Sequence, residues 1–402
     1  MKTHSEPWRR AASGAGLLGA DGSLTTTVFA EMTALAARTG AVNLGQGFPD
    51  EDGPDEVLDA ARDAIASGAN QYPPGRGLPT LREAIASHQG RFYGIDTDPD
   101  TQVLVTVGAT EALAATLLAF IEPGDEVVVL EPYYDSYAAI TALAGGRLRP
   151  VPLRYPDFRP DADDLRRAVT DRTRIILINS PHNPTGTVLD RQTLELIIEL
   201  AHRHDALIVA DEVYEHLTFG TPHLPIAGLP GGFARTVSVS SAGKTFSVTG
   251  WKIGWLTAPA ELVARILAVK QYLTFTGGAP FQLAIAVGLG LPDEWFAHAA
   301  TRLQARRDLL TPGLRAAGFA LSLPQAGYFV VADASPLGAT DAAAFCRKLA
   351  TSAGVAAIPL TAFAGPSRTD LTTLVRFAYC KRDDVLREAA TRLSAWASAP
   401  GR

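Results

Sequence analysis

The amino-acid sequence predicts an α/β fold with a mostly parallel central sheet, together with a smaller α+β lobe towards the C-terminus. Five runs in the middle of the chain are rich in Val, Ile and Leu, and helical patterns lie between or after them. Strands with continuous apolar residues are buried on both faces, which is typical of a parallel sheet covered by helices. After residue 281 the pattern changes to a long helical segment followed by short, separated β segments.

The elements follow one another in a regular order. Residues 1–24 are rich in Gly, Ser and Ala, and we expect them to form a flexible leader before a helix that ends at Gly40. The expected strands are residues 102–108, 126–134, 174–180, 206–214 and 236–241, and the expected helices of this region include 109–122 and 191–204. We expect the segment 148–160 to be irregular.

The C-terminal part has a different texture. We expect residues 293–318 to form one long helix that Pro312 breaks near its end, since proline cannot donate the helical hydrogen bond. Short β segments are expected at 328–333 and 374–380, with helices between them. These elements predict a second, smaller lobe that the N-terminal residues complete.

Composition excludes several classes of function. The chain has 402 residues, a formal net charge of −6 and no block of Lys and Arg, so we expect no nucleic-acid partner. No apolar run approaches the roughly 18 residues that span a bilayer, so we expect no membrane partner. The two cysteines, Cys346 and Cys380, are too few for a disulfide framework, which favours the cytoplasm.

The ends of the predicted strands carry the polar residues of interest, because ligands of open α/β sheets bind at the carboxyl ends of the strands. Gly108, Ala109 and Thr110 follow the first strand and begin a helix, whose free N–H groups suit a phosphate. An ordinary strand-to-helix turn explains the same residues. The sequence therefore indicates an anion site here only in combination with other signals.

The fourth and fifth strands lead into charged residues. Asp211 can be a helix cap or an ion-pair partner, or it can face a pyridine nitrogen and keep that nitrogen protonated. Tyr214 can reach the ring oxygen of the same cofactor. Lys244, in a run of small residues, suits a Schiff-base lysine if burial lowers its pKa, and Lys252 can supply a fixed charge for a phosphate. A surface lysine is the simpler interpretation of Lys244 alone.

Two further residues have a structural and a functional interpretation. Asn183, in an Asn-Pro-Thr-Gly segment, is typical of a turn but can also donate to a ring oxygen. Arg376 lies within an apolar strand, where it needs either a structural ion pair or the carboxylate of a substrate.

Taken together, these segments resemble class I aminotransferases of fold type I, which use pyridoxal 5′-phosphate (PLP). The resemblance extends from about residue 25 to 394. Its motifs are NLGQGFPDEDGP (43–54), NQYPPGRG (70–77), TVGATEAL (106–113), EPYYDSY (131–137), NSPHNPTG (179–186), DEVYEH (211–216), SSAGKTFSVTGWKIGW (240–255) and LVRFAYCKR (374–382). The sequence is most similar to the branch of N-succinyldiaminopimelate, kynurenine, glutamine–phenylpyruvate and methionine aminotransferases.

The resemblance implies a domain division and an assembly. It implies a large PLP-binding domain over residues 48–292 and a small domain formed by 25–47 and 293–402. It also implies a homodimer with shared active sites, in which Tyr72 of one subunit reaches the cofactor phosphate of the other. The expected partners are an amino acid and a 2-oxo acid.

The resemblance also implies a role for each candidate residue. Lys244 should bind the cofactor covalently and then move the substrate proton, while Asp211 and Tyr214 complete the catalytic set. Residues implied to contact the cofactor are Gly108, Ala109, Thr110, Tyr133, Asn179, Asn183, Asp211, Tyr214, Ser241, Lys244, Lys252 and Tyr72. Tyr133 is the expected stacking residue, with its neighbour Tyr134 as the alternative. Arg376, Gly47 and Asn183 are the residues implied to bind the substrate.

The implied activity is transamination between an L-amino acid and a 2-oxo acid, with glutamate and 2-oxoglutarate as one pair. N-succinyldiaminopimelate is one possible amino donor, and kynurenine, glutamine or methionine are the alternatives. β-Elimination from a cysteine S-conjugate can use the same site. A ligand sensor fused to a DNA-binding domain would need a basic segment that the N-terminus lacks.

We expect no metal site. The candidate metal ligands are three histidines, His202, His204 and His216, and the carboxylate of Asp211. The first two are two residues apart on an expected helix and therefore point to different faces.

Overall fold

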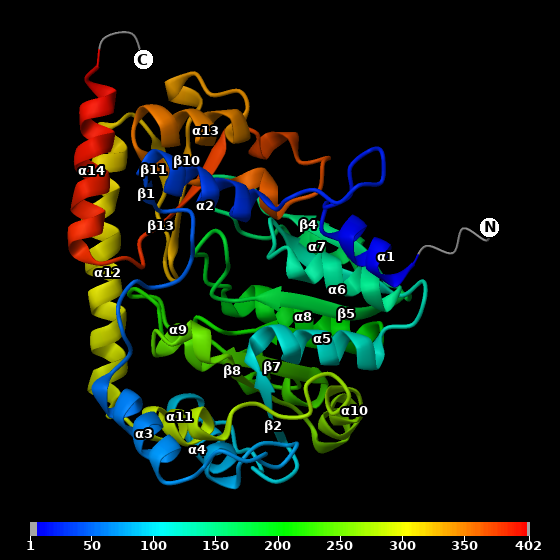
Figure 1. Ribbon diagram of the computed structural model, residues 1–402. Helices are drawn as coiled ribbons and strands as arrows, with labels where there is room; N and C mark the ends of the chain where they lie inside the picture. Colours follow the sequence, from blue (N-terminus) through cyan, green and yellow to red (C-terminus); the bar gives the residue numbers. More distant parts are fainter. Residues whose placement is uncertain (1–5, 400–402) are drawn as a thin grey trace.

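A seven-stranded sheet forms the centre of the computed structural model, which describes residues 6–399 (Figure 1). Its strands are β2 (Val103–Val107), β3 (Glu126–Glu131), β4 (Arg147–Pro152), β5 (Thr173–Asn179), β6 (Leu207–Asp211), β7 (Thr236–Ser241) and β8 (Ile253–Thr257). Their order is β2-β8-β7-β6-β5-β3-β4, and only β8 runs antiparallel to its neighbours. The predicted α/β fold with a mostly parallel sheet is confirmed.

Helices cover both faces of this sheet. Alternate residues of one strand face opposite cores: Ile175 and Leu177 pack with one set of helices, and Ile176 and Ile178 with the other. The first set comprises α5 (Gly108–Phe120), α6 (Ser136–Ala144) and α10 (Ala260–Lys270), and the second α7 (Ala162–Ala168) and α8 (Arg191–Arg203). Burial on both faces explains why these strands are apolar at every position.

Beyond the β2 end of the sheet lie helices that the sequence analysis did not define. They are α3 (Asp55–Ala66), α4 (Pro79–Tyr93) and α11 (Ala279–Leu289), while the one-turn helix α9 (Ala242–Thr245) follows β7. Two strands of the seven-stranded sheet were also missed. β4 forms the far edge of the sheet within the segment expected to be irregular, and β8 is short and antiparallel.

The second lobe contains a four-stranded sheet of order β12-β13-β10-β9 and a two-stranded sheet, β1-β11. Its strands are β1 (Val42–Asn43), β9 (Ala320–Ser322), β10 (Phe329–Asp333), β11 (Val355–Ala356), β12 (Ile358–Pro359) and β13 (Leu374–Ala378), and its helices are α2 (Val28–Thr39), α13 (Ala342–Ser352) and α14 (Asp383–Ala397). The pairing of β1 with β11 joins the N-terminal segment to this lobe. The domain boundaries at residues 48 and 292 stay a prediction.

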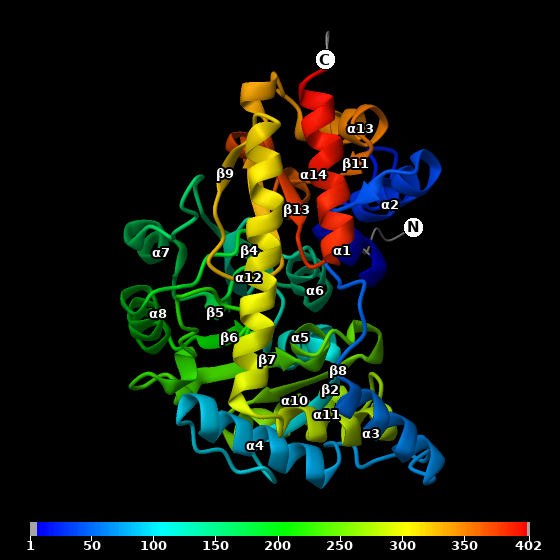
Figure 2. The same cartoon turned by 90° about the vertical axis from the view of Figure 1, so that its left-hand side faces the viewer.

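Helix α12 (Asp293–Ala316) connects the two lobes and lies beside α14, as Figure 2 shows. The predicted break at Pro312 is wrong, since the helix continues through this residue. Leu310 and Leu314, on either side of the proline, are completely buried. Their packing holds both halves of the helix against the same core and offsets the missing hydrogen bond.

The N-terminal segment differs from the expected flexible leader. Residues 7–14 form helix α1 (Pro7–Gly14), which packs against α6, and an isolated bridge pairs Leu18 with Leu24. Gly14 permits this contact, because a Cβ atom there would lie 2.6 Å from the carbonyl oxygen of Ala138. Residues 1–5 lie outside the described part. None of the described helices is long and apolar enough to cross a membrane.

Candidate active site

A cavity of about 220 Å³ lies at the carboxyl ends of β2, β5, β6 and β7. It brings together side chains that are up to 144 residues apart in the sequence. Ten of the predicted cofactor residues line it: Gly108, Ala109, Thr110, Asn179, Asn183, Asp211, Tyr214, Ser241, Lys244 and Lys252. The position agrees with the general location of ligand sites in open α/β sheets.

One end of the cavity is suited to an anion. Helix α5 begins at Gly108, so its first N–H groups and the positive end of its dipole face the cavity. Gly108 has a φ of 72°, and a Cβ atom there would lie 3.3 Å from the Lys252 ammonium nitrogen. The absence of a side chain therefore lets the lysine approach the start of the helix. The hydroxyl of Ser241 lines the same cavity and caps α9.

Lys252 lies directly before β8, whose antiparallel direction places its start at this edge of the sheet. Its φ of 55° is in the left-handed region that non-glycine residues rarely adopt. Gly254 packs against the start of α5, because a Cβ atom there would lie 2.6 Å from the carbonyl carbon of Gly108. The turn before β8 thus holds a cation at the anion end of the cavity.

Asp211 is the buried carboxylate of the site. Burial raises its pKa to about 6, although a hydrogen bond from Tyr137 and the positive charge of Lys244 favour the ionised form. The Tyr137 hydroxyl donates to one carboxylate oxygen over 2.6 Å. A buried carboxylate of this kind gains stability from a protonated ring nitrogen.

Lys244 projects between the two lobes. Its ammonium donates to the carbonyl oxygen of Gly47 over 3.1 Å, and the Tyr328 hydroxyl donates to the Lys244 carbonyl oxygen over 2.7 Å. Burial lowers its pKa, and the positive charges of Arg376 and Lys252 act in the same direction. A lysine with a lowered pKa supplies the neutral amine that a nucleophile or a base requires.

Arg376, on β13, is buried without a carboxylate partner among residues 6–399. Its two Nη atoms donate to Asn183 Oδ1 (3.1 Å) and to the Gly45 carbonyl oxygen (2.8 Å), while its Nε has no partner there. The guanidinium lies 3.7 Å from the ring centre of Phe329 and 4.5 Å from that of Phe363. The structure thus disfavours the structural ion pair and leaves a buried positive charge that a carboxylate can neutralise.

Two asparagines connect the strands behind the site. Asn179 donates to the backbone oxygen of Asp211 over 2.7 Å and accepts a hydrogen bond from the backbone N–H of Asn183 over 2.6 Å. The side-chain oxygen of Asn183 accepts a hydrogen bond from Arg376. Tyr214 packs edge-on against Tyr328, and burial raises its pKa. Asp211, the two asparagines and Arg376 therefore form one connected hydrogen-bond network.

Four predicted residues do not line the cavity: Arg376, Tyr133, Gly47 and Tyr72. Tyr133 is not part of the cavity lining, whereas Tyr134 is, so the structure favours Tyr134 as the ring that faces a bound cofactor. The backbone N–H of Tyr133 bonds instead to the carbonyl oxygen of Phe363 over 2.7 Å. Gly47 contacts Lys244, and it is Gly45 that accepts a hydrogen bond from Arg376. In both cases the residue with the contact lies one or two positions from the residue that was predicted.

Tyr72 is far from the cavity of its own chain. It is 84% exposed, lines a separate groove and packs edge-on against Phe275. Within one chain it contributes nothing to the site.

Sequence reasoning missed one aromatic residue and several smaller ones. Tyr137 and Thr249 line the cavity, and Tyr137 is the hydrogen-bond donor to Asp211. The only signal for Tyr137 is its place in the EPYYDSY motif, three residues after Tyr134 at the start of α6.

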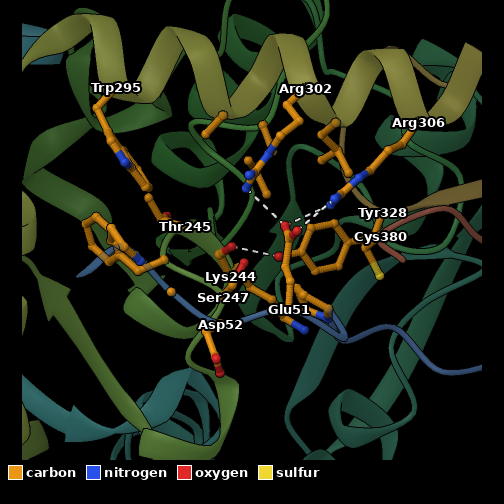
Figure 3. Close-up of a pocket in the computed structure, with 17 residues that line it drawn as sticks. Glu51, Asp52, Lys244, Thr245, Ser247, Trp295, Arg302, Arg306, Tyr328 and Cys380 are labelled. Atoms are coloured by element: carbon orange, nitrogen blue, oxygen red, sulfur yellow. Dashed lines mark hydrogen bonds and ion pairs between the residues drawn. The ribbon is translucent and has the colours of Figure 1, made fainter. Parts of the chain in front are cut away.

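A second cavity, of about 150 Å³, opens on Lys244 from the side of α12 (Figure 3). Its charged centre is Glu51, whose two carboxylate oxygens accept hydrogen bonds of 2.8 and 2.7 Å from Arg306. Arg302 adds an ion pair at 3.0 Å. Figure 3 shows both arginines pointing from α12 towards Glu51. This cluster attaches the helix to the segment that follows Gly47.

The Glu51 cluster gives a prediction for stability. Hydrogen bonds from Arg306 lower the pKa of Glu51 below its ordinary value of 4.5. Glu51→Gln is expected to lower the free energy of unfolding by about 1–3 kcal/mol near neutral pH. A carboxylate with a lowered pKa stabilises the protein above its unfolded-state pKa and loses this effect as the pH falls through the folded-state pKa. The difference from the wild type should therefore shrink below pH 4.5.

Urea unfolding across this pH range measures the effect, and Glu83→Gln is the control. Glu83 is exposed and forms no ion pair within the described part of the chain. A difference between wild type and Glu51→Gln that stays constant as the pH falls would contradict the ion-pair explanation.

Comparison with known proteins identifies the family. Residues 39–393 match the family model of class I and II aminotransferases, and the chain belongs to this family. It is 54% identical to the probable N-succinyldiaminopimelate aminotransferase DapC of Mycobacterium tuberculosis, over 93% of this chain and 97% of that protein. It is 39% identical to the methionine aminotransferase of Escherichia coli, over 92% and 96% of the two chains. The protein is therefore an aminotransferase, as the sequence motifs predicted.

Solved structures give the same result for the fold. The N-succinyldiaminopimelate aminotransferase from Mycobacterium tuberculosis superposes with a TM-score of 0.89 at 55% identity, covering 92% of this chain and 97% of that one. The predicted fold type I architecture is confirmed.

Proposed function

We propose that this aminotransferase binds PLP in the cavity at the strand ends and transfers an amino group between an L-amino acid and a 2-oxo acid. The observation that carries the proposal is the arrangement of three charged groups at the strand ends. Asp211 and Lys244 line the cavity, and Arg376 lies behind the lining residue Asn183, to which it donates a hydrogen bond. The charges of both Asp211 and Arg376 act on the pKa of Lys244. The two charges suit a cationic ring nitrogen and a substrate carboxylate, respectively.

The residues present fit PLP at both ends. The phosphate would bind to the N–H groups at the start of α5, the Ser241 hydroxyl and Lys252. Asp211 would pair with the ring nitrogen, Tyr214 and Asn183 would donate to the ring oxygen, and the neighbouring Tyr134 would cover one face of the ring. When bound, PLP supplies an electron sink that stabilises negative charge at the substrate α-carbon.

The remaining chemistry belongs to the protein. Lys244, with its lowered pKa, would remove the proton from the substrate α-carbon. It would then deliver a proton to C4′, the cofactor carbon on the other side of the amino nitrogen. Arg376 fixes the substrate carboxylate and thereby orients the bond that breaks, which is a positioning effect. Two substrates bind in turn to the same site, so the kinetics should be ping-pong.

The proposed assembly is a cytoplasmic homodimer with shared active sites. Tyr72 supports this assembly because it is an exposed aromatic residue outside the cavity of its own chain, and Phe275, which is also exposed, packs against it. Tyr72 would reach the phosphate of the partner subunit's cofactor. The cytoplasm is supported by the two cysteines, both buried and unpaired.

The proposed amino donor is N-succinyldiaminopimelate, with glutamate and 2-oxoglutarate as the second pair. The name of the Mycobacterium tuberculosis relative supports this choice, since the two chains share 54% of their residues over nearly their full length. Kynurenine and methionine are the alternative donors, because relatives that are 36% and 39% identical to this chain are named for these substrates.

Single-turnover spectroscopy tests both the reaction and the donor. The PLP-loaded enzyme is mixed with N-succinyldiaminopimelate, kynurenine, methionine or glutamate, without any oxo acid, and the visible absorbance of bound PLP is followed. We expect this band to disappear fastest with N-succinyldiaminopimelate and to return on addition of 2-oxoglutarate. A faster reaction with another donor would change the substrate, and release of pyruvate and ammonia from a cysteine S-conjugate without oxo acid would indicate β-elimination.

A further inference from the structure

A second group of buried polar residues lies outside the active-site cavity. His88, on α4, meets Glu215 and His216, which follow β6 by only a few residues. Their possible ligand atoms all lie within 4.8 Å of one another, and the Nε2 atoms of the two histidines are 2.6 Å apart. His88 and Glu215 are only 1% and 5% exposed.

The polar atoms of this group are incompletely satisfied. His88 Nδ1 is buried without a hydrogen-bond partner among residues 6–399, and so are both ring nitrogens of the neighbouring His223. His223 Nε2 lies at an ion-pair distance of 3.5 Å from Glu212. Buried polar atoms without partners are rare in native proteins and often mark the place of an ion or a water molecule.

The chemistry of the group is that of a metal site. His88 and His216 each offer an imidazole nitrogen and Glu215 offers a carboxylate oxygen, and these three atoms lie close enough together to share one ion.

We propose that His88, Glu215 and His216 form a binding site for a divalent transition-metal ion, for which zinc is the best match. Two imidazoles and one carboxylate are a common protein ligand set for zinc. With Zn–N distances of about 2.0–2.1 Å, two nitrogens of a tetrahedral site lie about 3.3 Å apart. The two rings must therefore separate by less than about 1 Å.

A cavity of about 450 Å³ supplies both the space and the route of entry. It opens to solvent and is lined by Glu215, His216, His223 and Tyr93. The fourth position of the metal would face this cavity, where His223 or a water molecule can occupy it. Phe92 and Phe296 also line this cavity, and both of their rings pack against His216.

The sequence alone did not point to this site. The expectation of no metal site rested on His202 and His204, and these residues bond elsewhere, to the Gly231 carbonyl oxygen and to Asp171. His88 precedes His216 by 128 residues, so no short ligand spacing exists. The fold brings the two together by placing α4 beside the segment that follows β6.

A metal here would stabilise the catalytic segment rather than react with substrate. Glu215 accepts a short hydrogen bond from Ser240, the residue before the cofactor-facing Ser241, and lies in the same segment as Asp211 and Tyr214. An ion bound to His88 would attach this segment to α4. The expected result of metal binding is therefore a higher unfolding temperature.

Equilibrium dialysis of the chelator-treated, PLP-loaded enzyme against zinc chloride tests the proposal. We expect one zinc ion per chain and an increase in the unfolding temperature. His88→Gln and His216→Gln should weaken zinc binding by about 100-fold or more, whereas the exposed His298→Gln should bind like the wild type. All proteins carry equal PLP, so any zinc held by the cofactor contributes equally.

Zinc binding that both glutamine variants retain, or the absence of stoichiometric binding in the wild type, would overturn the proposal. X-ray absorption of the zinc-loaded wild type provides a measurement that needs no variant. Two imidazole nitrogens at about 2.0–2.1 Å should appear in the first shell. A shell of water oxygens alone would also overturn the proposal, leaving the two histidines as a simple N–H···N pair.

Discussion

Lys244→Ala is expected to abolish transamination, with a loss of at least about 10⁴-fold in kcat. The lysine lines the cavity together with Asp211, the charges of Asp211 and Arg376 both act on it, and burial lowers its pKa as proton transfer requires. Lys252 cannot replace it, because its position before β8 directs it to the start of α5. Steady-state assays with the best amino donor measure the loss.

The matched control is Lys348→Ala, which removes an exposed lysine on α13 and should leave kcat unchanged. A second readout separates loss of chemistry from loss of fold: the variant should still bind PLP, but the absorbance of the complex should be that of non-covalently held cofactor. Substantial turnover by Lys244→Ala would show that another lysine performs the reaction.

The architecture of the large sheet was predictable because its strands are buried on both faces. Continuous apolar runs identified five of the seven strands, and β7 was predicted with its exact bounds. The two missed strands lack this signal. β4 is an edge strand with two arginines and two prolines, and β8 is interrupted by Gly254 and paired antiparallel. The break predicted at Pro312 was wrong because helix propensity depends only on the local sequence. The buried leucines on either side of the proline keep the helix continuous through it by tertiary packing.

The site was predictable to the extent that it lies at strand ends. Asp211 and Lys244 follow directly from the rule that ligands bind there. The choice between Tyr133 and Tyr134 did not follow, because adjacent residues after a strand end point in different directions and only the turn into α6 decides. The contact between Tyr137 and Asp211 joins residues 74 positions apart and depends on how α6 packs against β6. Sequence spacing contains no such information.

Arg376→Gln is expected to reduce kcat/KM by about 10²–10³-fold, mostly through KM. The guanidinium is buried, is flanked by aromatic rings and has an Nε that lacks a partner within the described residues. A substrate carboxylate supplies the missing acceptor and neutralises the charge. Glutamine keeps a hydrogen-bond donor but loses the charge and the forked geometry.

The decisive comparison uses two substrates, an amino acid and the corresponding amine that lacks the α-carboxylate. The wild type should prefer the amino acid strongly, and Arg376→Gln should lose most of this preference, because discrimination depends on the interaction that the variant lacks. Arg191→Gln, which changes an exposed arginine of α8, should keep the full preference. Equal preferences in wild type and Arg376→Gln would place the carboxylate site elsewhere and leave Arg376 with a structural role through Asn183 and Gly45.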